Sequence, residues 1–370
     1  MGGVFSRLRR VLIGLILVAA LGGGTLLYAE HPSRASEPAP PMASSVPVLD
    51  WSQELVRIQS GPGPAPSALP ATRAFAIMET AIYDAVAAPS PRPDAAASAA
   101  GHDVLAALYP GFRAELDALL DRELAGVPEG HGKQAGLAAG HLAALGRLAL
   151  GQGSDPFVLH RPDQFRSPAP DLGGVEFRQA LTEVFQFGED VSSFRRPDQA
   201  LAARFWSAPI WVTWNRIAEG AVTVHHAGLL VAARLFAELD LALADTAIAL
   251  ADAKNAYNVP RPVALIREVE SQAAWTPLLP TPADPSYPGA HSAESAAAAT
   301  VLAGFFGDRD RFAVTSDAVL GVTRHFDSYG AAAGEAGLSR IYGGVHTRVD
   351  HNAGVVLGHQ VATLVVNTSS

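Results

Sequence analysis

Apolar residues recur at helical spacing over most of this chain. In the first half, the clearest runs are residues 51–58, 72–88, 115–124 and 134–150. In the second half, helices are predicted at about 215–237, 239–256, 291–306, 310–332, 335–348 and 351–366. Between them, residues 152–200 have no clear period and predict a long loop or a set of short helices. Because no alternating run rich in Val and Thr predicts a strand, the pattern indicates an all-α helical bundle.

The N-terminus has the layout of a targeting segment. Arg7, Arg9 and Arg10 precede an uncharged apolar run from residue 11 to 28, so we expect residues 1–30 to be a signal peptide or an N-terminal membrane anchor. Residues 31–49 are rich in Pro, Ser and Ala and predict a flexible tether. The expected organisation is then an N-terminal helical part at 50–200, continuous with a catalytic bundle at 201–370. The product is expected to be exported: periplasmic, secreted, or attached to the membrane with its catalytic domain outside the cytoplasm.

The amino-acid composition excludes several classes of partner and catalytic site. Ala is abundant and 49% of the residues are apolar, which agrees with a helical fold. The formal net charge of −9 argues against nucleic acid as a partner, because binding phosphate backbones requires a basic face. The chain has no cysteine, which excludes thiolate nucleophiles, disulfides and cysteine-bound metal sites. Any anion site must therefore be a local concentration of cations.

The first candidate segment lies at the end of a predicted helix. Lys254 is placed near the helix C-terminus, where the helix dipole favours a cation. Pro260 and Pro262 stop the helix and restrict the backbone on both sides of Arg261. The segment is therefore expected to hold two cations in a rigid turn. A solvated Lys and Arg at a helix end would have the same sequence pattern.

The second segment begins a helix. Pro288 and Gly289 form a turn before Ala290 and His291, and a long Ala-rich run follows. Free backbone N–H groups at a helix N-terminus bind anions, and His291 would face such an anion. An ordinary capping role for Ser292, with His291 at the surface, is the alternative.

The third segment pairs a histidine with a carboxylate. His346 and Asp350 are four residues apart, so on a helix they would share one face. A carboxylate bonded to one ring nitrogen fixes the tautomer and makes the other nitrogen a better ligand or nucleophile. Gly343 and Gly344 indicate close approach of another helix or a ligand. An ordinary His–Asp surface pair would also fit this spacing.

In this order the three segments resemble the vanadium-dependent haloperoxidase and type 2 phosphatidic-acid phosphatase superfamily. That family's signature is Lys-x6-Arg-Pro, Pro-Ser-Gly-His and Ser-Arg-x5-His-x3-Asp. The first part is complete at Lys254–Arg261–Pro262, and the third is complete at Ser339–Arg340, His346 and Asp350. The second part keeps Pro and His but has Gly289–Ala290 in place of Ser-Gly. Further similarity at residues 72–86 and 324–341 favours the bacterial haloperoxidase-like branch and extends the resemblance over roughly 50–366.

The resemblance implies a helical bundle of the haloperoxidase/acid phosphatase type, with vanadate as cofactor and phosphate able to occupy the same site. It implies that Lys254, Arg261 and Arg340 neutralise the vanadate oxygens and that the N–H groups of Gly289 and Ala290 add hydrogen bonds. His346 would bind the metal axially, with Asp350 orienting it, and His291 would act as acid and base. The set of expected site residues is Lys254, Arg261, Gly289, Ala290, His291, Arg340, His346 and Asp350.

Three functions remain open at this stage. The first is a haloperoxidase that oxidises halide with hydrogen peroxide. The second is an exported acid phosphatase, in which His346 attacks the phosphorus of a phosphoester and His291 protonates the leaving alcohol. The third is a non-catalytic phosphate-binding helical protein.

Overall fold

The computed structural model describes residues 44–61, 67–151, 153–269 and 272–369. Residues Met42–Ser370 form one compact unit. Its helices are α1 Val46–Gln59, α2 Ala68–Ala87, α3 Pro93–Leu108, η1 Pro110–Phe112, α4 Arg113–Leu124, α5 His131–Leu150, α6 Val175–Phe187, α7 Pro197–Phe205, α8 Ile210–Val224, α9 Leu229–Tyr257, α10 Pro262–Val269, α11 Ala290–Phe306, α12 Tyr329–Tyr342 and α13 Arg348–Ser369. The predicted all-α fold is confirmed, apart from one β-hairpin.

Local chemistry sets the ends of the helices that carry the candidate site. Asn258 ends α9 in the left-handed conformation, at φ 45°, and Pro260 follows it. The side chain of Ser328 caps α12 by accepting a hydrogen bond from the Ala331 N–H at 3.0 Å. α12 ends where Gly344 adopts φ 79°, and a Cβ there would lie 2.4 Å from the Gly188 carbonyl oxygen. The close approach predicted around Gly343 and Gly344 is therefore a contact between the backbone at Gly344 and the backbone at Gly188.

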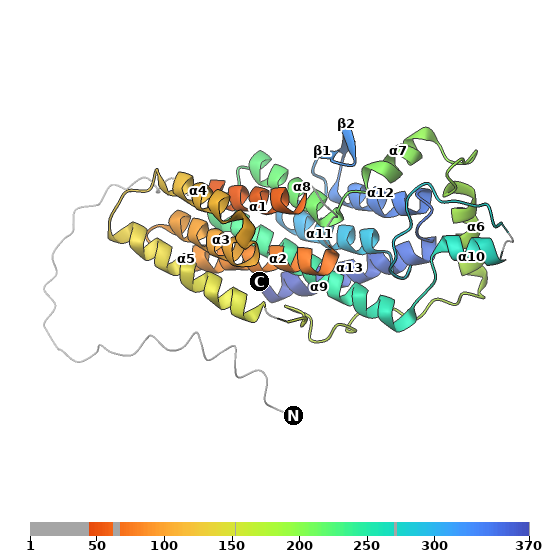
Figure 1. Cartoon of the computed structure of the whole chain (residues 1–370), viewed down its shortest axis with the longest axis horizontal. Helices are drawn as coiled ribbons and strands as arrows, with labels where there is room; N and C mark the ends of the chain where they lie inside the picture. The colour runs from red at the N-terminus through yellow and green to blue at the C-terminus, as the bar shows by residue number, and fades with distance from the viewer. Residues whose placement is uncertain (1–43, 62–66, 152, 270–271, 370) are drawn as a thin grey trace, which may run out of the picture. The chain divides into compact units, whose positions relative to one another are not determined.

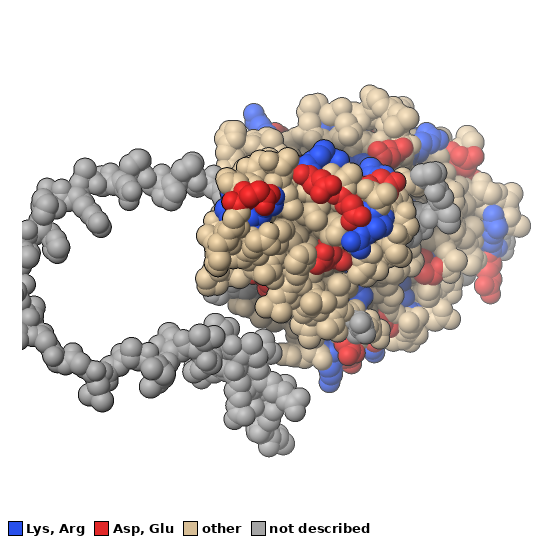
Figure 2. All heavy atoms as spheres, turned by 60° about the vertical axis from the view of Figure 1, so that its left-hand side comes forward, with Lys and Arg blue, Asp and Glu red and all other residues tan. Residues whose placement is uncertain are grey.

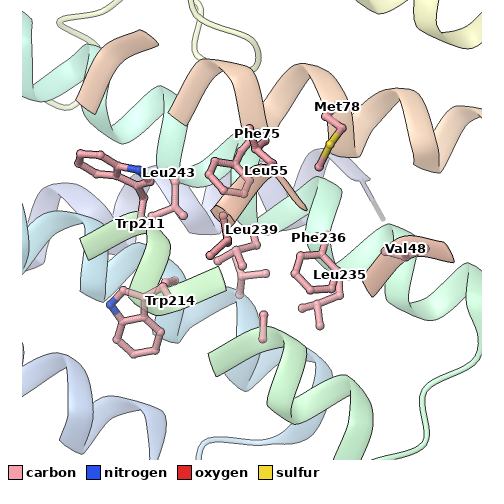
Figure 3. Close-up of a cluster of buried hydrophobic side chains, with 14 of the residues drawn as sticks. Val48, Leu55, Phe75, Met78, Trp211, Trp214, Leu235, Phe236, Leu239 and Leu243 are labelled. Carbon is pink, nitrogen blue, oxygen red and sulfur yellow. The ribbon is translucent and has the colours of Figure 1, made fainter. Parts of the chain in front are cut away.

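The main hydrophobic core lies between α1, α2, α8 and α9. Figure 3 shows part of it, with Phe75 from α2 near Leu239 and Leu243 from α9. The tryptophans at 206, 211 and 214 are buried between helices, and each indole N–H donates to a side chain. Their acceptors are Glu335 Oε1 at 2.9 Å, Gln59 Oε1 at 3.0 Å and Ser295 Oγ at 2.9 Å, respectively.

The second half of the chain surrounds α11. This helix packs against α9, α12 and α13, while α1 to α5 gather at the other end of the unit (Figure 1). The arrangement brings the C-terminal ends of α9 and α12 close to the N-terminal end of α11. The candidate residues of all three sequence segments lie on these ends or in the chain directly after α9 and α12.

A small-residue contact holds α11 against α13. A Cβ added at Gly358 of α13 would lie 1.9 Å from the carbonyl oxygen of Ala293 on α11, so only glycine fits there. Gly358→Ala is expected to lower the free energy of unfolding by about 1–3 kcal/mol, because overpacking forces the helices apart. Gly304→Ala, in α11 with nothing within 4 Å, should instead raise it by about 1 kcal/mol. Urea unfolding of both variants tests this, and equal effects would contradict it.

The predicted helix at 310–332 is wrong in its first part. Phe312–Ser316 (β1) and Val319–Phe326 (β2) form an antiparallel hairpin, with Phe312 opposite Phe326, and α12 begins only at Tyr329. The segment alternates in burial and contains β-branched and aromatic residues, which pack well on a pleated surface. Its alternation is short and was masked by the helical pattern on both sides.

Other boundaries differ more modestly. The break between α8 and α9 lies at 225–228, not at 238, because Gly228 begins α9. The Ala-rich helix α3 and the short helix α10 were not predicted. Residues 152–200 contain the short helices α6 and α7 within irregular chain. Residues 46–49, predicted as the end of the tether, are already helical.

The expected targeting segment at 1–30 and the tether at 31–43 lie outside the described residues. Within the part of the chain that is described, no helix is both long and apolar enough to cross a membrane. On the face shown in Figure 2, Lys and Arg side chains lie beside Asp and Glu, and no basic patch stands out there. The concentration of cations lies inside the molecule instead.

Candidate functional site

Three cations meet in a cavity of about 750 Å³. Lys254 comes from the last turn of α9, Arg261 from the segment before α10, and Arg340 from the last turn of α12. Their exposed fractions are only 5%, 8% and 6%, so the alternative of solvated surface cations does not hold. His291 and His346 line the same cavity. Five residues far apart in the sequence are thus brought together as the motifs predicted.

Two of these cations share a carboxylate that the sequence did not point to. Asp284 lies in the loop before α11 and pairs through Oδ2 with Lys254 Nζ at 2.9 Å and through Oδ1 with Arg261 Nη2 at 2.7 Å. Burial alone would raise the pKa of Asp284, but the two cations hold it below its usual value. Burial and the charge of Arg261 lower the pKa of Lys254, and burial lowers that of Arg261. Asp284 therefore occupies donors that an oxyanion would also use.

Asp284→Asn is expected to tighten the binding of inorganic phosphate by about 3–10-fold, because it removes a competing, half-exposed negative charge. Isothermal titration calorimetry measures the change. Asp317→Asn removes a similarly exposed carboxylate, paired with Arg216 on another part of the chain, and should leave the affinity unchanged. Weaker binding in the Asp284 variant would show that this carboxylate mainly positions the cations.

Arg340 differs from the other two cations. Its Nε and Nη1 atoms are buried and have no hydrogen-bond partner among the described residues. Burial, and then the charge of Arg261, lower the pKa of Arg340 to about 10. A buried donor of a charged group without a partner costs free energy, and an anion in the cavity would supply the acceptor. Arg340 therefore has two buried donors that an anion in the cavity could accept from.

The contacts of His346 define its tautomer. Its Nε2 lies 3.1 Å from Arg261 Nη1, and since a guanidinium only donates, Nε2 must hold a lone pair. Nδ1 then carries the hydrogen and faces Asp350 Oδ2 at 3.4 Å. Burial lowers the pKa of His346 to about 3, so the ring is neutral at neutral pH. In the structure this lone pair accepts from Arg261, so a metal or phosphorus bound to Nε2 would have to displace that hydrogen bond.

The predicted helical spacing of His346 and Asp350 is wrong, although the two side chains do face each other. α13 begins at Arg348, so His346 lies in the turn before it. Asp350 Oδ2 accepts hydrogen bonds from Ser286 Oγ and the Thr347 N–H, each at 2.7 Å, and the 3.4 Å to His346 exceeds a normal hydrogen bond. Burial would raise the pKa of Asp350, but the nearby His346 ring and the hydrogen bonds from Thr347 and Ser286 lower it below its usual value.

His291 is held by a backbone carbonyl. Its Nε2 lies 2.8 Å from the Trp206 oxygen, and because a carbonyl only accepts, Nε2 carries the hydrogen. Burial and the charge of Arg340 lower the pKa of His291 well below its usual value. The ring is therefore neutral with a lone pair on Nδ1, which suits a proton acceptor better than a donor.

The start of α11 only partly matches its expected role. The Gly289 N–H donates to the Asp350 carbonyl oxygen at 2.9 Å, so this amide is not free for an anion in the structure. The N–H of Ala290, the first residue of α11, has no acceptor among the described residues. A Cβ at Gly289 would lie 3.1 Å from the Asp350 carbonyl oxygen, which is tighter than ordinary contact. A serine at this position would therefore press against Asp350.

Glu294 is a second site residue that sequence reasoning missed. It lines the cavity one turn after His291, its exposed fraction is 1%, and its Oε2 has no partner among the described residues. The signal was present: Glu294 is the one charged residue in the Ala-rich stretch from Ser292 to Phe306, three positions after His291. The signal for Asp284 was weaker, because a carboxylate in a Pro-rich loop is common.

Comparison with known proteins gives matches to the fold and to the last part of the chain. Residues 234–370 match the family model of the VCPO second helical-bundle domain. A bacterial vanadium-dependent iodoperoxidase structure superposes with a TM-score of 0.76 at 23% identity, covering 90% of this chain and 98% of that one. An apo-type bacterial vanadium-dependent chloroperoxidase has a TM-score of 0.69 at 14% identity, covering 82% and 94%. The holo-type form has 0.67 at 13%, covering 87% and 92%. A sequence search of curated proteins gave no match.

These similarities cover both the segment that carries the site and the fold of the chain. The identities to the solved structures are low, so those structures establish the fold, while the family model covers the segment from α9 onward. The chain therefore has the fold of these solved vanadium-dependent peroxidase structures, and its residues 234–370 match the model of the VCPO second helical-bundle domain.

Proposed function

We propose that this protein is a vanadate-dependent haloperoxidase that oxidises halide with hydrogen peroxide. The observation that carries the proposal is Arg340, whose buried Nε and Nη1 have no partner among the described residues. They lie in a cavity that also contains the Nε2 lone pair of His346. A tetrahedral oxyanion with a metal centre needs both features: donors for its oxygens and one ligand for the metal. Lys254 and Arg261 add positive charge on the same wall.

The residues present fit vanadate. Lys254, Arg261 and Arg340 would neutralise its oxygens, the Ala290 N–H would donate at the helix N-terminus, and His346 Nε2 would be the metal ligand. Bound vanadate would supply Lewis-acid activation of hydrogen peroxide. The neutral ring of His291 can accept a proton at Nδ1 from a peroxide entering the cavity. Asp350 faces His346 Nδ1 and favours the tautomer in which Nδ1 carries the hydrogen and Nε2 carries none.

Phosphoester hydrolysis is the second candidate, because the same Nε2 lone pair of His346 is placed as a nucleophile among three cations. Phosphate would then occupy the position proposed for vanadate. Export, with the catalytic part outside the cytoplasm, is proposed for either activity on the basis of the N-terminal sequence.

One experiment separates the candidates. The purified protein is stripped with a chelator and assayed for peroxide-dependent halide oxidation with and without added vanadate, and for phosphoester hydrolysis in parallel. Oxidation restored by vanadate is the expected result. Hydrolysis that vanadate inhibits would support the phosphatase instead, and inactivity in both assays would support a non-catalytic binding protein.

A further inference from the structure

The proposed reaction consumes a proton. Halide gives two electrons to one peroxide oxygen, a halogen–oxygen bond forms and the oxygen–oxygen bond breaks. The leaving oxygen then takes up a proton, so halide, hydrogen peroxide and one proton give hypohalous acid and water. A group in the cavity must deliver that proton at neutral pH, and the two histidines do not suit this task. His291 holds its one hydrogen at Nε2, on the Trp206 carbonyl oxygen, and His346 is the proposed metal ligand.

Glu294 is the remaining candidate inside the cavity. It projects from α11 one turn after His291, and both residues line the cavity. Its side chain is buried, its Oε2 has no partner among the described residues, and no described cation lies within ion-pair distance of it. A structural carboxylate in a helix interior would be paired or hydrogen-bonded, because an isolated buried charge is very costly. The carboxyl group is therefore stable here as a neutral acid with a transferable hydrogen.

We propose that Glu294 is the proton donor of this cavity, in the role that the sequence motif suggests for His291. His291 then serves only as the acceptor, so two residues on the same face of α11 divide the acid and base functions. The role of Glu294 in halide oxidation rests on the proposed function. The protonation of Glu294 does not depend on that function.

The surroundings of Glu294 agree with this assignment. Burial raises the pKa of Glu294 to about 8, and the charge of Lys254 opposes the rise only in part. From α8 the cavity wall is apolar, formed by Ile210 and Trp211. The charged and titratable groups that line the cavity from the other elements are Lys254 on α9, Arg261 and Asp284 on the flanking loops, Arg340 on α12, and His346 before α13.

Glu294→Gln is the direct test, because glutamine keeps the size and polarity but cannot release a proton. With the vanadate-loaded protein, peroxide and iodide, kcat is expected to fall by at least about 100-fold, the usual contribution of a general acid. The wild-type rate should also decline as the pH rises through about 8, where Glu294 loses its proton, and the variant should lack this decline. An unchanged kcat and pH profile in the variant would overturn the proposal.

A binding measurement tests Glu294 without any turnover. Inorganic sulfate is a tetrahedral dianion whose charge is constant through neutral and mildly alkaline pH. Its affinity for wild-type protein should fall above about pH 8, because ionised Glu294 then repels it, and the affinity of Glu294→Gln should fall less. Identical pH dependence in the two proteins would overturn the proposal. If wild type binds sulfate as expected but oxidises no halide, the proposed function fails while Glu294 remains the protonated group.

Glu219→Gln is the matched control. Glu219 is a carboxyl on α8 outside the cavity, its pKa is also raised by burial, to about 7, and it accepts a hydrogen bond from Ser52 Oγ at 3.3 Å. Its replacement should leave both the iodide rate profile and the sulfate profile unchanged. If this variant shifts the profiles as much as Glu294→Gln, a general effect of removing buried carboxyls explains them, and the proposal is overturned.

Discussion

His346→Ala is expected to lower kcat/KM for halide oxidation by at least about 1000-fold. The lone pair on His346 Nε2 is the proposed metal ligand in the cavity, and Ala cannot replace it. Residual oxyanion binding should persist, because Lys254, Arg261 and Arg340 remain. The rate of vanadate-dependent triiodide formation, measured together with vanadate affinity, separates the two effects.

His359→Ala provides the control, since His359 lies on α13 and its ring contacts only Thr300 Oγ1, away from the cavity. That variant should retain full activity. Activity that survives His346→Ala would contradict the assignment of the metal ligand and, with it, the mechanism.

Arg340→Met is expected to change binding and stability in opposite directions. Removing a buried charge that pairs with the bound anion should weaken vanadate binding by about 2–5 kcal/mol, which is roughly 30- to 4000-fold. In the absence of anion, the free energy of unfolding should rise by about 1–3 kcal/mol, because a buried guanidinium with unpartnered Nε and Nη1 is replaced by an apolar side chain. Calorimetric titration with vanadate and urea unfolding of the chelator-treated protein measure the two quantities.

Arg348→Ala is the matched control for Arg340→Met. Arg348 lies eight positions later and pairs with Glu183, with N–O distances of 2.5 and 3.2 Å, outside the cavity. Its loss should leave vanadate affinity unchanged and should not stabilise the protein. A variant of Arg340 that is less stable without anion would show that this guanidinium is already satisfied in the free protein.

The long helices α2 and α13 were predictable because their apolar residues recur at helical spacing. The hairpin at 312–326 was not, because strand pairing joins short segments whose pattern is ambiguous in isolation. The helix α3 was missed for another reason: its Ala and Ser residues give almost no contrast between faces.

The residues of the candidate site were likewise only partly predictable from the sequence. Lys254, Arg261, Arg340 and His346 were found because their spacing within each motif is distinctive, and the fold brings them to one cavity. Asp284 was not found, since its pairing with two cations exists only in three dimensions. Arg340 Nε and Nη1 also lack a hydrogen-bond partner among the described residues. This depends on the three-dimensional surroundings of the side chain, which a local sequence pattern does not contain.

One oxyanion is expected to bind between Arg340 and Nε2 of His346. A crystal structure of the protein soaked with vanadate measures this directly. Vanadium should be bonded to His346 Nε2, with Arg340 Nε or Nη1 donating to a vanadate oxygen. Vanadate bound elsewhere, or bound in the cavity while Arg340 remains without an acceptor and His346 Nε2 stays on Arg261, would contradict it.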